Sequence, residues 1–66
     1  MLHCGDPVWV KGYIRQGQDK VDVYSYGVIL ENQINRKNTI LVRLEKFNGE
    51  HNVDKRVLIK FIAKLN

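Results

Sequence analysis

The chain has 66 residues, of which 11 are Lys or Arg and seven are Asp or Glu, so its formal net charge is +4. A chain this short forms one domain with a thin core, so we expect residues 1–66 to bind partners on an outer face or in a groove rather than in a deep catalytic pocket. The single cysteine, Cys4, excludes an internal disulfide, and the short apolar stretches exclude a membrane-spanning helix.

The first predicted strand begins near Pro7, where a missing N–H group is least unfavourable. It continues through Val8-Trp9-Val10, in which the two valines share one face and Trp9 points to the other. Residues 12–22 are polar and contain two glycines, so we expect a long, exposed loop there.

A second strand is predicted for residues 23–31, which are rich in β-branched and aromatic residues. Gly27 lies inside this strand, and an internal glycine indicates a bulge or a sharp bend, as at the corner of a barrel. The polar residues 32–38 are expected to form a second connection.

The clearest strand signal covers residues 39–46, where apolar and polar side chains alternate with a period of two. The side chains expected to face the core are Ile40, Val42 and Leu44. Asn48-Gly49 follows at once and is a strong hairpin signal. We therefore expect residues 50–54 to return as an antiparallel strand.

The last segment, residues 55–65, fits two interpretations. Its apolar residues have helical spacing, which would give a short amphipathic helix across the sheet. Alternatively, residues 55–58 form a single 3₁₀ turn and residues 59–63 form a closing fifth strand. We favour the second interpretation, because a five-stranded barrel needs its last strand to cover the edge of the first.

In this order the segments resemble the SH3-like barrel. The opening Gly5-Asp6-Pro7-Val8-Trp9-Val10-Lys11 is similar to the start of retroviral integrase C-terminal domains and of Tudor or KOW-type modules. Residues 40–46, followed by Asn48-Gly49 and Val57-Leu58, resemble the photosystem I stromal subunit PsaE and the variable subunit of ferredoxin–thioredoxin reductase. The resemblance implies an all-β, five-stranded SH3-like barrel with a short 3₁₀ turn before the last strand, but it fixes no activity.

The positive charge favours an acidic partner, namely nucleic acid or an acidic protein surface, although it also suits an ordinary solvated surface. Cations that converge on one face would neutralise phosphates, and binding would then weaken steeply with salt. The candidate cations are Lys11, Arg15, Arg36, Lys37, Arg43, Lys55 and Arg56.

Aromatic residues form the second candidate set. Trp9, Tyr24 and Tyr26 are expected on strand surfaces, where their rings could stack on bases. The same rings could instead line a cage for methylated lysine or a groove for a peptide. Phe47, next to the Asn-Gly turn, is expected to cap the core.

Metal binding and catalysis have little support in the sequence. His3, Cys4 and His51 are the only soft metal ligands and are scattered, so we predict no metal site and no cofactor. No acid–histidine pair or phosphate-binding loop is recognisable. Without a signal peptide pattern, we expect an intracellular location in the cytoplasm or nucleus.

The leading hypothesis is therefore a non-catalytic, basic module that binds nucleic acid through Lys, Arg and exposed aromatic residues. Two alternatives remain. The first is an accessory protein-docking subunit of the PsaE type, and the second is a Tudor-like reader of methyl-lysine or peptide.

Overall fold

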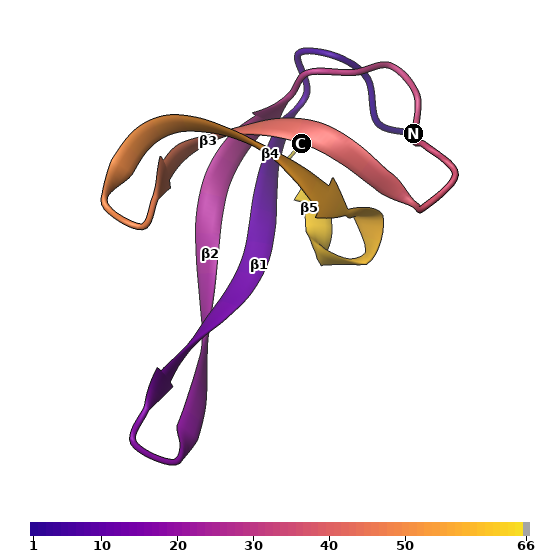
Figure 1. The fold of residues 1–66 in the computed structure, drawn as a ribbon. Coiled ribbons are helices and arrows are strands. Elements are labelled where there is room, and N and C mark those ends of the chain that lie inside the picture. Colours follow the sequence, from indigo (N-terminus) through magenta and orange to yellow (C-terminus); the bar gives the residue numbers. More distant parts are fainter. Residues whose placement is uncertain (66) are drawn as a thin grey trace.

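The structure, a computed structural model, describes residues 1–65 and is all-β. Five antiparallel strands form one sheet in the order β4-β3-β2-β1-β5 (Figure 1). The elements are β1 (Pro7–Gln16), β2 (Asp19–Ile29), β3 (Thr39–Phe47), β4 (Glu50–Leu58), the 3₁₀ turn η1 (Ile59–Phe61) and β5 (Ile62–Lys64). No helix in this part of the chain is both long enough and apolar enough to cross a membrane.

A long β1–β2 hairpin replaces the loop that the sequence suggested for residues 12–22. The pairing runs without interruption from Pro7–Val28 to Gln16–Asp19. A two-residue turn closes the hairpin, and its first residue, Gly17, has a φ of 66°. Glycine is favoured there because a type II′ turn needs positive φ at that position. The prediction that this segment is exposed was right, but the prediction that it is a loop was wrong.

Only the base of the β1–β2 hairpin has neighbouring strands. β2 pairs with β3 over residues 27–29, and β1 pairs with β5 over residues 8–10. Beyond this base, residues 11–24 form a two-stranded ribbon, here called the arm, which projects from the rest of the sheet (Figure 1). The molecule is accordingly elongated, with extents of 38 × 24 × 22 Å.

Gly27 allows β3 to cross closely over β2. A Cβ atom at this position would lie 2.7 Å from Val42 Cγ1 and 3.0 Å from the Arg43 carbonyl oxygen. No side chain larger than hydrogen fits without moving the β3 backbone. The glycine therefore marks the bend at which the arm and the β3–β4 hairpin separate.

The core is small and consists of aliphatic side chains from the first four strands. Its buried members are Val8, Val10, Ile29, Ile40, Val42, Leu44 and Val57. The predicted alternation in β3 is confirmed, because its three inward residues are all buried. Phe47 packs against this cluster, as expected.

The predicted β3–β4 hairpin is confirmed. Asn48 and Gly49 have φ angles of 51° and 80°, as a type I′ turn requires. β4 is longer than the expected residues 50–54, because it continues to Leu58, and Val57 pairs with Ile40 and enters the core. The 3₁₀ turn and the last strand follow in the predicted order but begin later in the chain, and the amphipathic helix is not formed.

The sheet is not closed into a barrel, contrary to the expected five-stranded barrel. β5 covers part of the edge of β1, but β4 and β5 remain the two edges of the sheet. β5 is only three residues long, and η1 separates it from β4 without any pairing between the two strands. The architecture is thus an open, strongly curled antiparallel sheet.

We expect Gly27→Ala to lower the free energy of unfolding by about 1–3 kcal/mol, the usual effect of overpacking. Gly12→Ala is the matched control, because its new Cβ would meet nothing closer than Val23 Cγ2 at 3.9 Å. That variant should keep its stability within about 0.5 kcal/mol or gain slightly. Urea unfolding measures both, and equal losses would contradict the close approach at Gly27.

Candidate functional site

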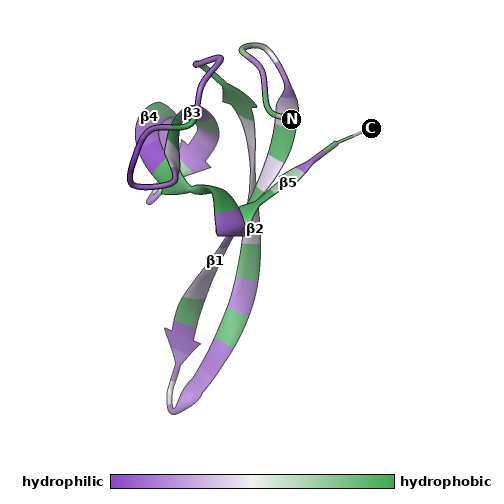
Figure 2. Cartoon of the chain, turned by 90° about the vertical axis from the view of Figure 1, so that its right-hand side faces the viewer, coloured by the Kyte–Doolittle hydropathy of each residue, from purple (hydrophilic) through white to green (hydrophobic). Residues whose placement is uncertain are grey.

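One face of the β1–β2 hairpin carries alternating aromatic and charged side chains. Strand alternation places these residues opposite the buried Val8 and Val10, and we call this side the outer face. Its members in the hairpin are Trp9, Lys11, Tyr13 and Arg15 on β1 and Lys20, Asp22, Tyr24 and Tyr26 on β2. The alternation of hydrophobic and hydrophilic residues along both strands is visible in Figure 2.

Five of the predicted site residues come together on this face. Trp9 pairs with Tyr26, Lys11 pairs with Tyr24, and Arg15 lies further along the same strand. The Trp9 and Tyr26 rings meet edge to face, with centroids 5.9 Å apart and an interplanar angle of 78°. This contact fixes Trp9 while leaving 40% of the residue exposed.

Two aromatic residues on the outer face are more exposed than Trp9. Tyr24 is 59% exposed and Tyr13 is 57% exposed. A shallow, almost entirely apolar hollow of about 380 Å³ lies between Trp9, Tyr24 and Ala63. Two rings line it, whereas the methyl-lysine interpretation requires three or more rings that converge.

The cations of the outer face differ in their neighbours. Lys11 Nζ lies 3.5 Å from the carboxylate of Asp22, and Lys20 Nζ lies 4.4 Å from the centre of the Tyr13 ring. Arg15 is directly opposite Lys20 and has no carboxylate within 4 Å among the described residues. Like charges in directly opposite positions destabilise a strand pair, so a bound anion at the arm tip would relieve this repulsion.

Arg36 and Lys37 do not join this face. They lie in the connection between β2 and β3, at the end of the molecule away from the arm tip (Figure 1). Asn35 organises this connection, because its Oδ1 accepts hydrogen bonds from the backbone N–H groups of Lys37 and Thr39 at 3.0 and 2.9 Å. The two cations therefore lie in an ordered connection at the opposite end of the molecule from the arm tip.

Arg43 is held in an ion pair on the sheet surface. Its Nε lies 2.8 Å from Asp54 Oδ1, and its Nη2 lies 3.1 Å from Asp54 Oδ2, which makes a two-pronged contact. Hydrogen bonds and attraction from this guanidinium lower the pKa of the Asp54 carboxyl, and the carboxylate raises the pKa of Arg43.

Arg56 makes the same kind of contact with Glu31, at 2.9 and 2.8 Å. Glu31 Oε1 also accepts a hydrogen bond from the Leu41 N–H at 2.9 Å. The Arg56 hydrogen bonds and then this backbone N–H lower the pKa of the Glu31 carboxyl. In each of these two arginines, Arg43 and Arg56, the paired carboxylate offsets the positive charge that would attract a phosphate and occupies two of the five N–H donors.

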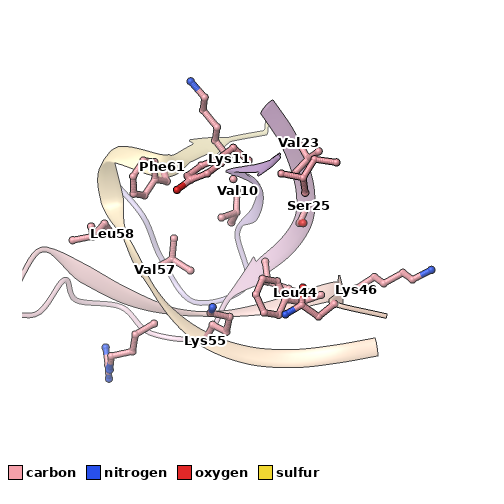
Figure 3. A pocket seen from close by; sticks show the side chains of 16 residues that line it. Val10, Lys11, Val23, Ser25, Leu44, Lys46, Lys55, Val57, Leu58 and Phe61 are labelled. Atoms are coloured by element: carbon pink, nitrogen blue, oxygen red, sulfur yellow. The ribbon is translucent and has the colours of Figure 1, made fainter. Parts of the chain in front are cut away.

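Lys55 lies on the side of the sheet opposite the aromatic rings of the outer face. Its Nζ is 4.1 Å from the centre of the Phe47 ring. It lines a hollow of about 490 Å³, here called the groove, between the arm and the β3–β4 hairpin (Figure 3). Lys55 therefore belongs to a second surface and not to the outer face.

The site predicted from the sequence did not include Tyr13 and Lys20, although it included Arg15 from the same predicted loop. The signal was present in the chain. Tyr13 and Arg15 alternate with Ile14, and Val21 and Val23 alternate with polar residues, on either side of Gly17-Gln18. Two short alternating runs around a two-residue turn with glycine are a hairpin pattern.

Residues 1–65 contain no group of three or more His, Cys, Asp or Glu side chains placed to hold a metal ion. Cys4 is exposed, and its backbone N–H donates a hydrogen bond to Asn32 Oδ1 at 2.9 Å. This contact ties the N-terminal segment to the β2–β3 connection.

Comparison with known proteins gives no relative. No protein-family model matches the chain, and neither the curated proteins nor the solved structures give a significant match. Its function must therefore be inferred from its own residues.

Glu31→Gln should destabilise the protein at neutral pH, because it weakens the contacts to Arg56 and Leu41. The folded-state pKa of Glu31 is lowered from its ordinary 4.5, so this contribution is present above that value and is lost as the pH falls through the lower one. The stability gap between wild type and variant should therefore narrow as the pH falls below about 4.5. Glu45→Gln, at a position without an ion pair in the described chain, is the control, and a gap independent of pH would refute the assignment.

Proposed function

We propose that this protein is a non-catalytic module that binds single-stranded nucleic acid on the outer face of the β1–β2 hairpin. The observation that carries the proposal is the placement of exposed aromatic rings and cations on one face by strand alternation and register. Bases stack on such rings whatever their sequence, and cations beside the rings hold the backbone phosphates.

The proposed roles follow from exposure and neighbours. Trp9 and Tyr24 flank an apolar hollow and offer ring surface to bases. Arg15 and Lys20, at the end of the arm, supply positive charge that no carboxylate within 4 Å neutralises in the described chain. Lys11 contributes less, because Asp22 already lies beside it.

A single strand suits this face better than a duplex. The rings are presented on an open surface, where unpaired bases can reach them, whereas a duplex hides the faces of its bases. The proposed contacts to phosphates are few, so affinity should depend on stacking as well as charge. We expect little sequence preference, because every base has a face to stack.

We also propose that the sheet is an SH3-like barrel left open between β4 and β5. The pairing of β5 with β1 and the 3₁₀ turn before β5 support this assignment. Such barrels serve many functions, so the fold adds nothing to the choice of ligand.

Trp9 is the only tryptophan of the chain and provides a direct probe. Titration with oligothymidylate at low salt should quench its fluorescence, with an apparent Kd below about 100 μM and a log–log salt slope of about −0.7 per phosphate contact. Unchanged fluorescence over that range, together with unchanged anisotropy of a labelled oligonucleotide, would sink the proposal.

Substitutions separate stacking from charge. Tyr24→Ala should lose about 1–3 kcal/mol of binding free energy, while Tyr24→Phe should retain it, because the ring and not the hydroxyl stacks. Arg15→Gln should make the salt slope shallower by about 0.7. Arg36→Gln is the matched control, because it removes the same charge at the other end of the molecule, and an equal effect of both changes would argue for binding by net charge alone.

A further inference from the structure

The groove between the arm and the β3–β4 hairpin is a second surface, which shares only Lys11 and Tyr13 with the outer face. Its apolar floor comes from four strands and the 3₁₀ turn, with contributions from Val10, Val23, Leu44, Val57, Leu58 and Phe61. In Figure 3 these side chains surround a hollow that is open to solvent. Phe61 and Leu58 are each 39% exposed, so the groove leaves apolar surface in contact with water.

The charges around this groove have one sign. Lys11, Lys46, Lys55 and Arg56 line it, and none of its lining residues is acidic. The amino groups of Lys11 and Lys46 extend away from the floor (Figure 3), which leaves an apolar centre with a positive rim. Lys46 and Lys55 have no carboxylate within 4 Å among residues 1–65, so their charges are not neutralised by the described chain.

A free strand edge runs along the same groove. β2 is 11 residues long but pairs with β3 only over residues 27–29. Residues 19–26 of β2 therefore have no partner on the β3 side, and two of them, Val23 and Ser25, line the groove. Unpaired strand edges accept extended peptides, whose alternate side chains then reach the surface below.

We propose that this groove binds an extended, acidic segment of another protein, which adds to the free edge of β2. Apolar side chains of the segment would cover the floor between the arm and the β3–β4 hairpin. Its Asp or Glu side chains would meet the exposed Lys46 at the rim and the half-buried Lys55 beside Phe47. A second copy of this chain is a poorer occupant, because its net charge of +4 would repel the positive rim.

The probe is a fluorescein-labelled peptide of about eight residues, an ordinary strand length, in which Leu or Phe alternates with Glu. Two control peptides replace either every Glu by Lys or every Leu and Phe by Ser. We expect the first peptide to bind the full chain in a polarisation titration, and both controls to bind at least about tenfold more weakly. Absence of binding up to about 1 mM, or equal binding of either control, would overturn the proposal.

Lys46→Glu should weaken binding of the acidic peptide about tenfold or more, because it turns an attraction into a repulsion. Lys37→Glu makes the same charge change away from the groove and should leave the affinity within about twofold. Lys55→Glu should act like Lys46→Glu, but Lys55 also contacts Phe47. For that reason the test depends on Lys46, which is exposed. Equal losses of peptide affinity in Lys46→Glu and Lys37→Glu would refute specific binding in the groove.

Amide signals in ¹⁵N-labelled protein locate the bound peptide. We expect the largest shifts at Val23, Ser25 and Lys46, and slower hydrogen exchange of β2 amides when the peptide is present. Chemical-shift changes centred on Trp9 and Tyr24 would contradict the proposal, and so would competition by oligothymidylate. A dimer detected by sedimentation, with the groove covered by its interface, would also contradict it. Because the Trp9 titration reports on the other face, failure here leaves the nucleic-acid proposal standing, and the reverse also holds.

Discussion

The close approach of two strands at Gly27 determines the shape of this molecule. At this position the β3 backbone and the side chains of Val42 and Leu44 occupy the space that a side chain on β2 would need. β2 therefore lies between β1 and β3 only near its end, where Ile29 enters the core, and pairs with β1 alone over the rest of its length. The arm and the groove both exist because the strands separate beyond this crossing.

The two sides of the hairpin consequently have different chemistry. The outer face combines exposed rings with Arg15 and Lys20, whereas the groove combines an apolar floor with a rim of cations. The net charge of the chain does not show where a ligand binds, because carboxylates offset some of the cations. Arg43 and Arg56 are paired with carboxylates, and Lys64 Nζ lies 3.4 Å from Asp6. The cations that remain without carboxylates are the ones that matter for each proposed ligand.

The sequence predicted the all-β class, the core face of β3 and the Asn48-Gly49 turn, because these features depend on local alternation and on turn chemistry. It also placed Trp9, Tyr24 and Tyr26 correctly on strand surfaces. The arm was missed because its polar composition was interpreted as a loop, although the alternation on either side of Gly17-Gln18 is a hairpin pattern. The sequence could not reveal the ion pair of Arg56 with Glu31, since the two residues are 25 positions apart and meet only through the curvature of the sheet. The prediction that the barrel closes was also wrong. Closure requires contact between the edge strands, and β5 is only three residues long.

Amide hydrogen exchange measured by NMR tests most directly whether the arm stands free of the core. Amides of β2 near Ile29 should exchange only on global unfolding, whereas the paired amides of residues 12–16 and 19–23 should exchange through local opening at a much lower free energy. A steep fall in protection on passing Gly27 toward the arm tip is the predicted result. Uniform protection along the whole of β2 in the monomeric protein would show that the arm is packed against other structure, and it would contradict both surfaces described above.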